Sequence, residues 1–160
     1  MSVRVQVSGV LCVVSWISLT MIGCADVSRT TEGGIESGHL IELRLVREEE
    51  GPDLIAVVYD GAVTYLDPEP LLSDEDLTRV EPVVRPGQLI LRVELTPSAG
   101  ERMFSRTADE VGSRLAIIVD GKVRSAPVIR DAVKGPAEMV ISASAEEAAK
   151  LSELVRARWP

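Results

Sequence analysis

Few side chains in this chain of 160 residues belong to the types that carry out covalent or metal chemistry. The chain contains two cysteines, Cys12 and Cys24, and one histidine, His39. Two cysteines cannot form a disulfide scaffold or a four-thiolate zinc site, and one histidine leaves too few ligands for most transition-metal sites. The sequence therefore predicts neither a disulfide-rich domain nor a zinc domain.

The candidates for acid–base or nucleophilic catalysis are equally sparse. His39 stands beside Gly38 at the predicted start of the folded domain, where a solvated or pairing role is favoured over a catalytic one. Ser125 has no base near it in sequence, and serine catalysis needs one. An enzyme is therefore the least favoured class, and we predict no catalytic or cofactor-binding residue.

Acidic residues form the one cluster that could attract a cation. This cluster lacks the alternating ligands and central glycine of a calcium-binding loop. We interpret its second half as the solvated start of a short helix that Ser73 caps, and we predict no metal site. The residues concerned are Asp67, Glu69, Asp74, Glu75 and Asp76.

The overall charge disfavours a nucleic acid partner. The chain has 17 Lys and Arg residues against 25 Asp and Glu residues, a formal net charge of −8 at pH 7. Nucleic acid affinity comes mainly from cations that neutralise phosphates, and no basic cluster is present in the sequence. Arginines scattered among the acids are interpreted as solvated: Arg79, Arg85, Arg92, Arg102, Arg106, Arg114, Arg124 and Arg130.

The first 23 residues differ from the rest of the chain. They contain one base, Arg4, no acid, and an apolar run from Val5 to Ile22. A basic start followed by an apolar stretch and small residues is typical of a secretory signal that is removed. The alternative is an uncleaved membrane helix, because such a run would be about 27 Å long as a helix.

The end of the run, Met21-Ile22-Gly23-Cys24, resembles the lipobox of bacterial lipoproteins. That resemblance implies that residues 1–23 are a lipoprotein signal peptide. It also implies that Cys24 receives diacylglycerol and becomes the new N-terminus. Added palmitate should be incorporated into this lipid and thereby label the protein. Ala25 follows Cys24, which by the sorting habit of diderm lipoproteins favours the outer membrane over the inner one. We expect the protein to be lipid-anchored in the cell envelope and to face the periplasm.

The exported part is expected to consist of a tether and one domain. Residues 24–38 carry the lipidated cysteine followed by a mostly polar stretch. After Ala25 its only apolar residues are Val27 and Ile35, so this stretch is expected to be a flexible tether. Residues 39–160 predict one domain of ordinary size.

Strand patterns occur throughout the predicted domain. Apolar residues alternate with charged ones in 40–47, which predicts a half-buried strand. Asp60-Gly61 and Asp120-Gly121 each separate two β-branched runs, which predicts hairpins with type I′ turns over 55–66 and 115–124. Further strands are predicted at 80–84 and 89–95.

Two amphipathic helices complete the pattern. The first begins at Thr96-Pro97, ends at Gly112, and is expected to bury Ala99, Met103, Phe104, Thr107, Ala108 and Val111. The second begins with a capping box of Ser144 and Glu147 and ends near Arg158, with Trp159 packed at its end. The fold class is therefore α+β, a mainly antiparallel sheet with two amphipathic helices packed on one face.

Several motifs in this order resemble the head part of the large periplasmic domain of SecD, a subunit of the SecDF protein-export complex. The Asp-Gly hairpin followed by Ser125-Ala126-Pro127 is the most specific of them. The resemblance covers roughly residues 40–155 and assigns structural roles to its motif positions. These positions are Pro68, Pro70, Phe104, Gly112, Asp120, Gly121, Ser125 and Pro127.

The resemblance also implies a setting for the function. SecD carries transmembrane helices that couple proton flow to movement, whereas this chain has at most one apolar segment. We therefore expect a non-enzymatic, membrane-anchored lipoprotein whose head-like domain binds exported or unfolded polypeptide, or an envelope partner, and assists protein export. The alternative is an accessory domain that docks onto an envelope complex without binding client protein.

Overall fold

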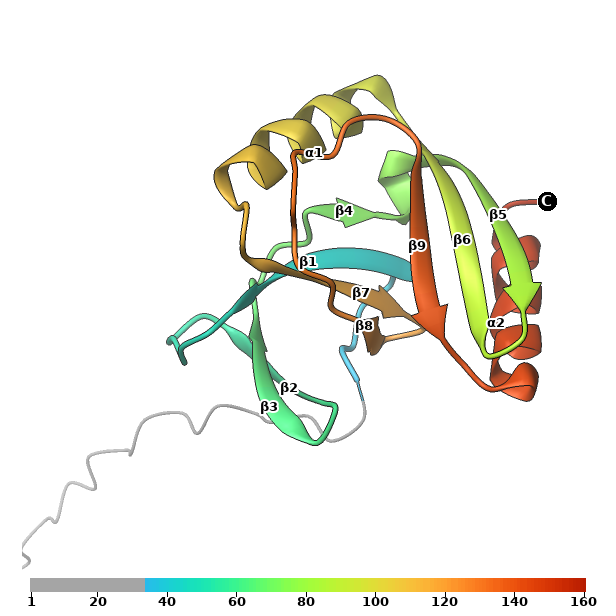
Figure 1. Ribbon diagram of the computed structural model, residues 1–160, viewed down its shortest axis with the longest axis horizontal. Helices are drawn as coiled ribbons and strands as arrows, with labels where there is room; N and C mark the ends of the chain where they lie inside the picture. The colour runs from blue at the N-terminus through green and yellow to red at the C-terminus, as the bar shows by residue number, and fades with distance from the viewer. Residues whose placement is uncertain (1–33) are drawn as a thin grey trace, which may run out of the picture.

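The computed structural model describes residues 34–160 (Figure 1). The predicted signal 1–23, Cys24 and residues 25–33 of the predicted tether lie outside the described residues. Within the described part, none of the helices has the length and apolar character needed to cross a membrane.

The described chain forms nine strands, two α-helices and one short 3₁₀ turn, η1. The strands are β1 (Ile41–Arg47), β2 (Ile55–Tyr59), β3 (Ala62–Leu66), β4 (Leu72–Ser73), β5 (Leu77–Arg85), β6 (Gln88–Leu95), β7 (Arg114–Val119), β8 (Lys122–Ser125) and β9 (Ala137–Ser142); η1 spans Asp74–Asp76, α1 spans Pro97–Asp109 and α2 spans Ala145–Arg158. The α+β class with mainly antiparallel strands and two helices is confirmed. The strands divide into two sheets rather than one.

The larger sheet has six strands, in the order β2-β3-β1-β7-β8, and β4 also pairs with β1. Both predicted Asp-Gly hairpins are present in it, at opposite ends of this order. Asp60 and Asp120 have φ values of 52° and 54°, and the glycines that follow them have 76° and 70°. Positive φ at both central residues is the signature of the type I′ turn, so the turn prediction is confirmed at both sites.

Strand β1 lies in the middle of this sheet, and both of its faces are covered. Ile41, Leu43 and Leu45 face the main core, while Glu42 and Arg44 are 0 % and 5 % exposed on the opposite side. The prediction of a half-buried strand is therefore wrong. The reason is that a second, smaller core of Val57, Leu66, Ala116 and Ile118 forms on that side of the sheet.

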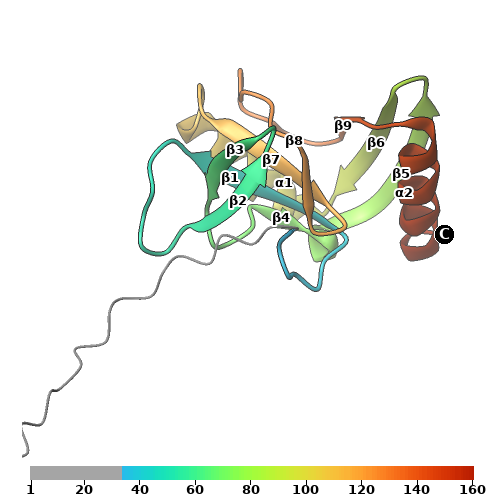
Figure 2. The same ribbon diagram turned by 90° about the horizontal axis from the view of Figure 1, so that it is seen from below.

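The smaller sheet has the order β5-β6-β9. Its strands direct Val80, Leu91, Val93, Met139 and Ile141 into the main core. Helix α2 packs against β5 and β6 and adds Ala148, Leu151 and Val155 to that core. In Figures 1 and 2, α2 and β5 lie at one end of the molecule and the β2–β3 hairpin lies toward the other.

Helix α1 begins where predicted, with the Thr96 hydroxyl accepting a hydrogen bond from the Ala99 amide. Ala99, Met103 and Thr107 are buried, but Phe104, Ala108 and Val111 are exposed, Phe104 and Val111 by 42 % and 56 %. The predicted burial of these last three residues is wrong. The buried stripe is narrow, following every fourth residue from Ala99, so Phe104 and Ala108 lie outside it, and Val111 lies beyond the end of the helix.

Helix α2 also begins where predicted, and Ser144 accepts a hydrogen bond from the Glu147 amide at 3.2 Å. The side chain of Glu147 forms an ion pair with Arg124 of β8. Trp159 caps the helix and packs against the main core, as predicted.

Residues 34–38 of the predicted tether lie against the β7–β8 turn. The Ile35 amide donates a hydrogen bond of 2.6 Å to the Gly121 carbonyl. The Ile35 side chain packs against the smaller core. Gly121 tolerates no side chain here, because a Cβ atom would lie 2.8 Å from the Ile35 carbonyl oxygen.

Candidate functional site

A loop rich in proline, Asp67–Leu71, connects β3 to β4 and contains the predicted motif residues Pro68 and Pro70. Its ends are fixed to β1: the Asp67 amide donates to the Leu45 carbonyl at 3.0 Å, and the Leu71 amide donates to the Leu43 carbonyl at 2.7 Å. Between these two bonds the chain bulges away from the sheet. We call this segment the proline loop.

Arg44 of β1 binds the proline loop through two of its backbone carbonyl groups. Its Nη1 donates to the Asp67 carbonyl at 3.0 Å and also to the Pro68 carbonyl. Its Nε pairs with Glu42 Oε2 at 2.7 Å, and both side chains are almost fully buried. A proline has no N–H, but its carbonyl needs a donor, and a buried guanidinium supplies it. The other oxygen of Glu42, Oε1, is buried without a hydrogen-bond partner among residues 34–160.

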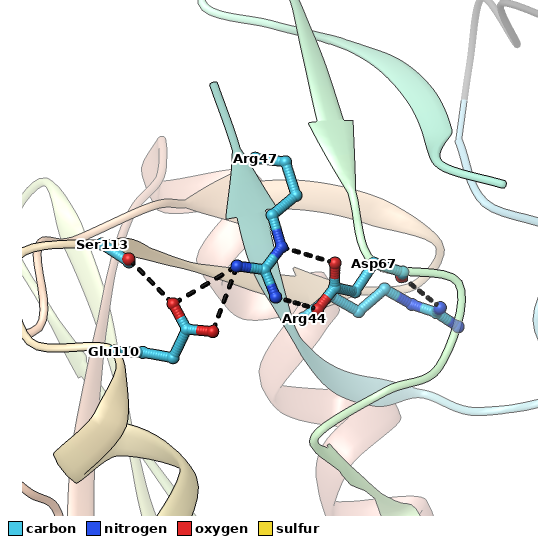
Figure 3. A network of polar contacts seen from close by, with 5 residues as sticks. All are labelled: Arg44, Arg47, Asp67, Glu110 and Ser113. Carbon is cyan, nitrogen blue, oxygen red and sulfur yellow. Dashed lines mark hydrogen bonds and ion pairs between the residues drawn. The ribbon is translucent and has the colours of Figure 1, made fainter. Parts of the chain in front are cut away.

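Arg47 closes a second polar network at the start of the loop (Figure 3). Its Nε and Nη2 each lie 2.7 Å from an oxygen of Asp67, which is a bidentate pair. Its Nη1 lies 3.1 Å from Glu110 Oε1, and Ser113 donates to Glu110 Oε2 at 3.0 Å. The hydrogen bond to Asp67, helped by Glu110, raises the pKa of Arg47 above its ordinary value, so this guanidinium stays charged.

A cleft of about 340 Å³ separates the proline loop from α1. Leu45 lines it from β1, and Arg102 and Arg106 line it from the helix. Arg102 is held by Asp76 at 2.6 Å and by the Leu71 carbonyl at 3.4 Å. The loop and its cleft are therefore a preformed surface feature, which we call the proline-loop cleft.

The remaining motif residues do not converge on this cleft. The amide of Gly112 donates to the Ile129 carbonyl at 2.9 Å, and the Pro127 carbonyl accepts from the Leu115 amide at 2.9 Å, so these two positions belong to one ladder beside β7. Asp120 and Gly121 form the β7–β8 turn that receives Ile35, and Ser125 ends β8 opposite Ile117. Each of these positions lies in a turn or a ladder.

Phe104 lies on the exposed flank of α1. The Nζ of Lys134 lies 5.4 Å from the centre of its ring, a cation–π contact. The neighbouring Thr107 is buried, donates to the Met103 carbonyl at 2.7 Å and accepts from the Val133 amide at 2.8 Å. Phe104 and Thr107 thus both contact the segment that precedes β9.

Asp74 is buried, contrary to the prediction from the sequence. It is 6 % exposed, and its two oxygens accept from the Leu40 and Ile41 amides at 2.9 and 2.8 Å. The prediction of a solvated acidic helix start is therefore wrong for Asp74, whereas Glu75 is exposed as predicted. The buried carboxylate accepts hydrogen bonds from the amide at the start of β1 and from the amide before it.

One arginine was interpreted wrongly as solvated, because Arg124 is half-buried and pairs with Glu147. Arg114 is exposed as predicted, although its Nε donates to the Ala126 carbonyl at 3.0 Å. Arg92 is exposed as predicted, and its hydrogen bond to Glu138 raises its pKa above the ordinary value. Within the described residues, no three His, Cys, Asp or Glu side chains are grouped closely enough to hold a metal ion.

The domain thus combines an α+β fold of two antiparallel sheets with a braced proline loop. The chain belongs to the family described as SecDF, P1 head subdomain, which matches residues 49–158. The resemblance to the SecD head is therefore confirmed.

Relatives and solved structures agree with this family. The protein translocase subunit SecDF of Thermus thermophilus is 34 % identical over 115 residues, 71 % of this chain and 15 % of the relative. SecD of Treponema pallidum is 46 % identical over 61 residues, 38 % of this chain and 10 % of the relative. A solved structure of "a membrane component SecDF that enhances protein export" has 26 % identity and a TM-score of 0.53, and the match covers 74 % of this chain and 62 % of that chain. This chain spans 10 % and 15 % of the lengths of these two relatives.

Proposed function

We propose that this protein is a non-enzymatic, lipid-anchored domain of the cell envelope that binds polypeptide or an envelope partner and assists protein export. The observation that carries the proposal is the family match over residues 49–158, since the relatives are subunits of protein translocases. Fold alone does not transfer a function, so the proposal needs a physical route and a direct test.

Unpaired strand edges supply the physical route to polypeptide binding. Strands β2 and β8 end the larger sheet, and β5 and β9 end the smaller one, so each has one edge without a strand partner within residues 34–160. An extended polypeptide can add to such an edge through main-chain hydrogen bonds, with little demand on its sequence. Binding of this kind suits a protein that meets many exported chains.

The proline loop favours the second candidate, an accessory domain that docks onto one folded envelope protein. Arg44 and Arg47 hold this loop in one conformation, so its surface is formed before any partner arrives. A preformed surface loses little conformational entropy on binding a folded partner of matching shape.

Photocrosslinking in cells separates the two candidates. We suggest placing a photoreactive residue, in the full-length protein, at Pro68 of the proline loop, at Val58 of β2, or at Thr78 of β5, all of which are exposed. Crosslinks from a strand position to many newly exported, pulse-labelled chains would support polypeptide binding. Capture of one fixed envelope protein from Pro68, with no exported chains from any position, would contradict it and favour the docking domain.

The lipid anchor has its own test. Radioactive palmitate should label the wild-type protein and the control variant Cys12→Ala, because Cys12 lies within the predicted signal. It should not label Cys24→Ala. Unchanged labelling of Cys24→Ala would refute lipidation at this residue, and membrane fractionation of the labelled protein would test the predicted preference for the outer membrane.

A further inference from the structure

A groove of about 380 Å³ runs between β5 and the C-terminal turn of α2. One wall consists of residues 78–82 of β5, and the other includes Arg156, Arg158 and the half-buried Trp159. Because β5 is the last strand of its sheet, its unpaired edge borders this groove. Strand β5 and helix α2 lie at the right of Figure 1. We call the groove between them the β5–α2 groove.

Two features limit how much of the β5 edge can pair with another strand. The register shifts between Leu77 and Arg79, which leaves Thr78 out of the ladder with β6. Pro82, further along, has no N–H to donate. Bulges and prolines of this kind are devices that prevent long strand addition at sheet edges. The edge from Arg79 to Glu81 can therefore accept a short extended segment but not a whole strand.

The groove is basic although the protein is acidic. Arg156 and Arg158 line it from α2, in a chain of net charge −8. Arg79 and Glu81 border it from β5, where they alternate with the buried Val80 and lie on the same face of the sheet as Arg92 and Glu94. Arg79 has a weak exposed partner, Glu94, at 3.9 Å. Within the described part of the chain, Arg156 has no carboxylate at ion-pair distance. Its charge is therefore available to a ligand.

Arg158 makes only one long ion-pair contact within the described residues. Its Nε lies 3.6 Å from Asp74 Oδ2, and its side chain is 59 % exposed. Asp74 already accepts hydrogen bonds from two backbone amides. A second guanidinium with free donors therefore also lines the groove at the end of α2.

We propose that the β5–α2 groove binds a short, extended segment of polypeptide that carries carboxylate side chains. This inference rests on the proposed polypeptide binding and adds its position and the chemistry of the segment. Main-chain hydrogen bonds to residues 79–81 hold the segment, and the ring of Trp159 offers it an apolar wall. The arginines attract acidic side chains and disfavour basic ones.

A second copy of this chain fits the groove less well than such a segment. Pairing β5 with β5 of another copy would join only the few residues between Thr78 and Pro82, which buries little surface. The same arrangement would bring the basic grooves of the two copies together, and like charges at an interface oppose association.

The test uses the purified lipoprotein in detergent and two synthetic peptides of the same extended sequence, one with two aspartates and one with two lysines. Fluorescence anisotropy should show that the aspartate peptide binds about tenfold more tightly at low salt, since each exposed ion pair contributes up to about fivefold. Arg156→Glu should remove this preference. Arg130→Glu, an exposed arginine outside the groove, is the matched control and should keep it.

Each other outcome overturns the proposal. Equal affinity for the two peptides, or equal effects of Arg156→Glu and Arg130→Glu, would exclude the groove as the site. If exported chains then still crosslink from Val58 or Pro68 but not from Thr78, polypeptide binding stands and only its position is wrong. A dimer seen by light scattering and lost in Arg156→Glu would assign the edge to a second copy.

Discussion

Arg47 joins three parts of the chain through one side chain. It comes from β1, pairs with Asp67 at the start of the proline loop and reaches Glu110 after α1. The two carboxylates are each 18 % exposed, so neither is well hydrated. Removing the guanidinium would leave two poorly solvated negative charges beside each other, which is more costly than losing a surface ion pair.

We expect Arg47→Met to lower the free energy of unfolding by about 2 kcal/mol, because two charge-assisted interactions are lost. Arg92→Met, which breaks the exposed pair with Glu138, is the control and should leave stability nearly unchanged. Urea unfolding followed by circular dichroism measures both. Equal effects of the two substitutions would contradict a bracing role for Arg47.

The loss of stability in Arg47→Met should not depend on pH in the neutral range. The pKa of Arg47 is raised in the folded state, so its contribution is complete at every pH below the ordinary arginine pKa and is lost only above that value. The difference between Arg47→Met and the wild type should therefore be equal at about pH 6 and about pH 9. If the difference in unfolding free energy disappeared at the higher pH, a group other than the Arg47 guanidinium would be its main cause.

Asp74 supports a second residue-scale prediction. Asp74→Ala leaves the Leu40 and Ile41 amides without an acceptor, and we expect it to cost about 2–4 kcal/mol of stability. The neighbouring Glu75→Ala, at an exposed position of the same 3₁₀ turn, should stay within about 0.5 kcal/mol of the wild type. Thermal unfolding of both variants measures the difference, and similar midpoints would refute the capping role.

At the scale of elements, the two Asp-Gly hairpins have the same turn geometry in different surroundings. A Cβ atom on Gly61 would meet nothing within 4 Å, whereas one on Gly121 would lie 2.8 Å from the Ile35 carbonyl oxygen. The β7–β8 turn is therefore both a hairpin turn and the attachment point of residues 34–38.

The two turns can be compared by the same substitution. Gly61→Ala should cost about 1 kcal/mol, the strain of alanine at positive φ. Gly121→Ala should cost clearly more, because it also displaces Ile35 from the turn. Denaturant unfolding gives the costs, and faster hydrogen exchange at the Ile35 amide in Gly121→Ala alone would confirm the cause. Equal costs with unchanged exchange would contradict it.

At the scale of the whole molecule, two sheets and two helices share one hydrophobic core. Leu43 of the larger sheet and Leu91 of the smaller one both belong to it, at 4 % and 0 % exposure. Because both sheets contribute side chains to this main core, and the smaller core lies on the other face of the larger sheet, we expect residues 34–160 to unfold as one unit.

This expectation can be tested with Leu43→Ala and Leu91→Ala. Each should cost about 3 kcal/mol, since a large buried side chain is removed. Trp159 at the end of α2 should report the same unfolding midpoint as far-UV circular dichroism in both variants, although Leu43 lies in the other sheet. Separate midpoints in Leu43→Ala would show that the sheets unfold independently.

The sequence alone determined the local structure of this protein. The two type I′ turns, the Thr96 and Ser144 caps and the starts of both helices depend on residues within a few positions of one another, so their types are sufficient to predict them. The family motifs were readable for the same reason, because each is a short local pattern.

Only the tertiary structure decided which polar residues are buried and what they hold. Arg47 meets partners 20 and 63 positions away, and Asp74 caps residues 33 and 34 positions before it. An alternating strand has the same pattern whether its polar face meets water or a second core, so the burial of Glu42 and Arg44 depended on which strands cover β1. The division into two sheets, and with it the free edge of β5 beside α2, likewise depends on strand pairing between distant segments, which local patterns do not specify.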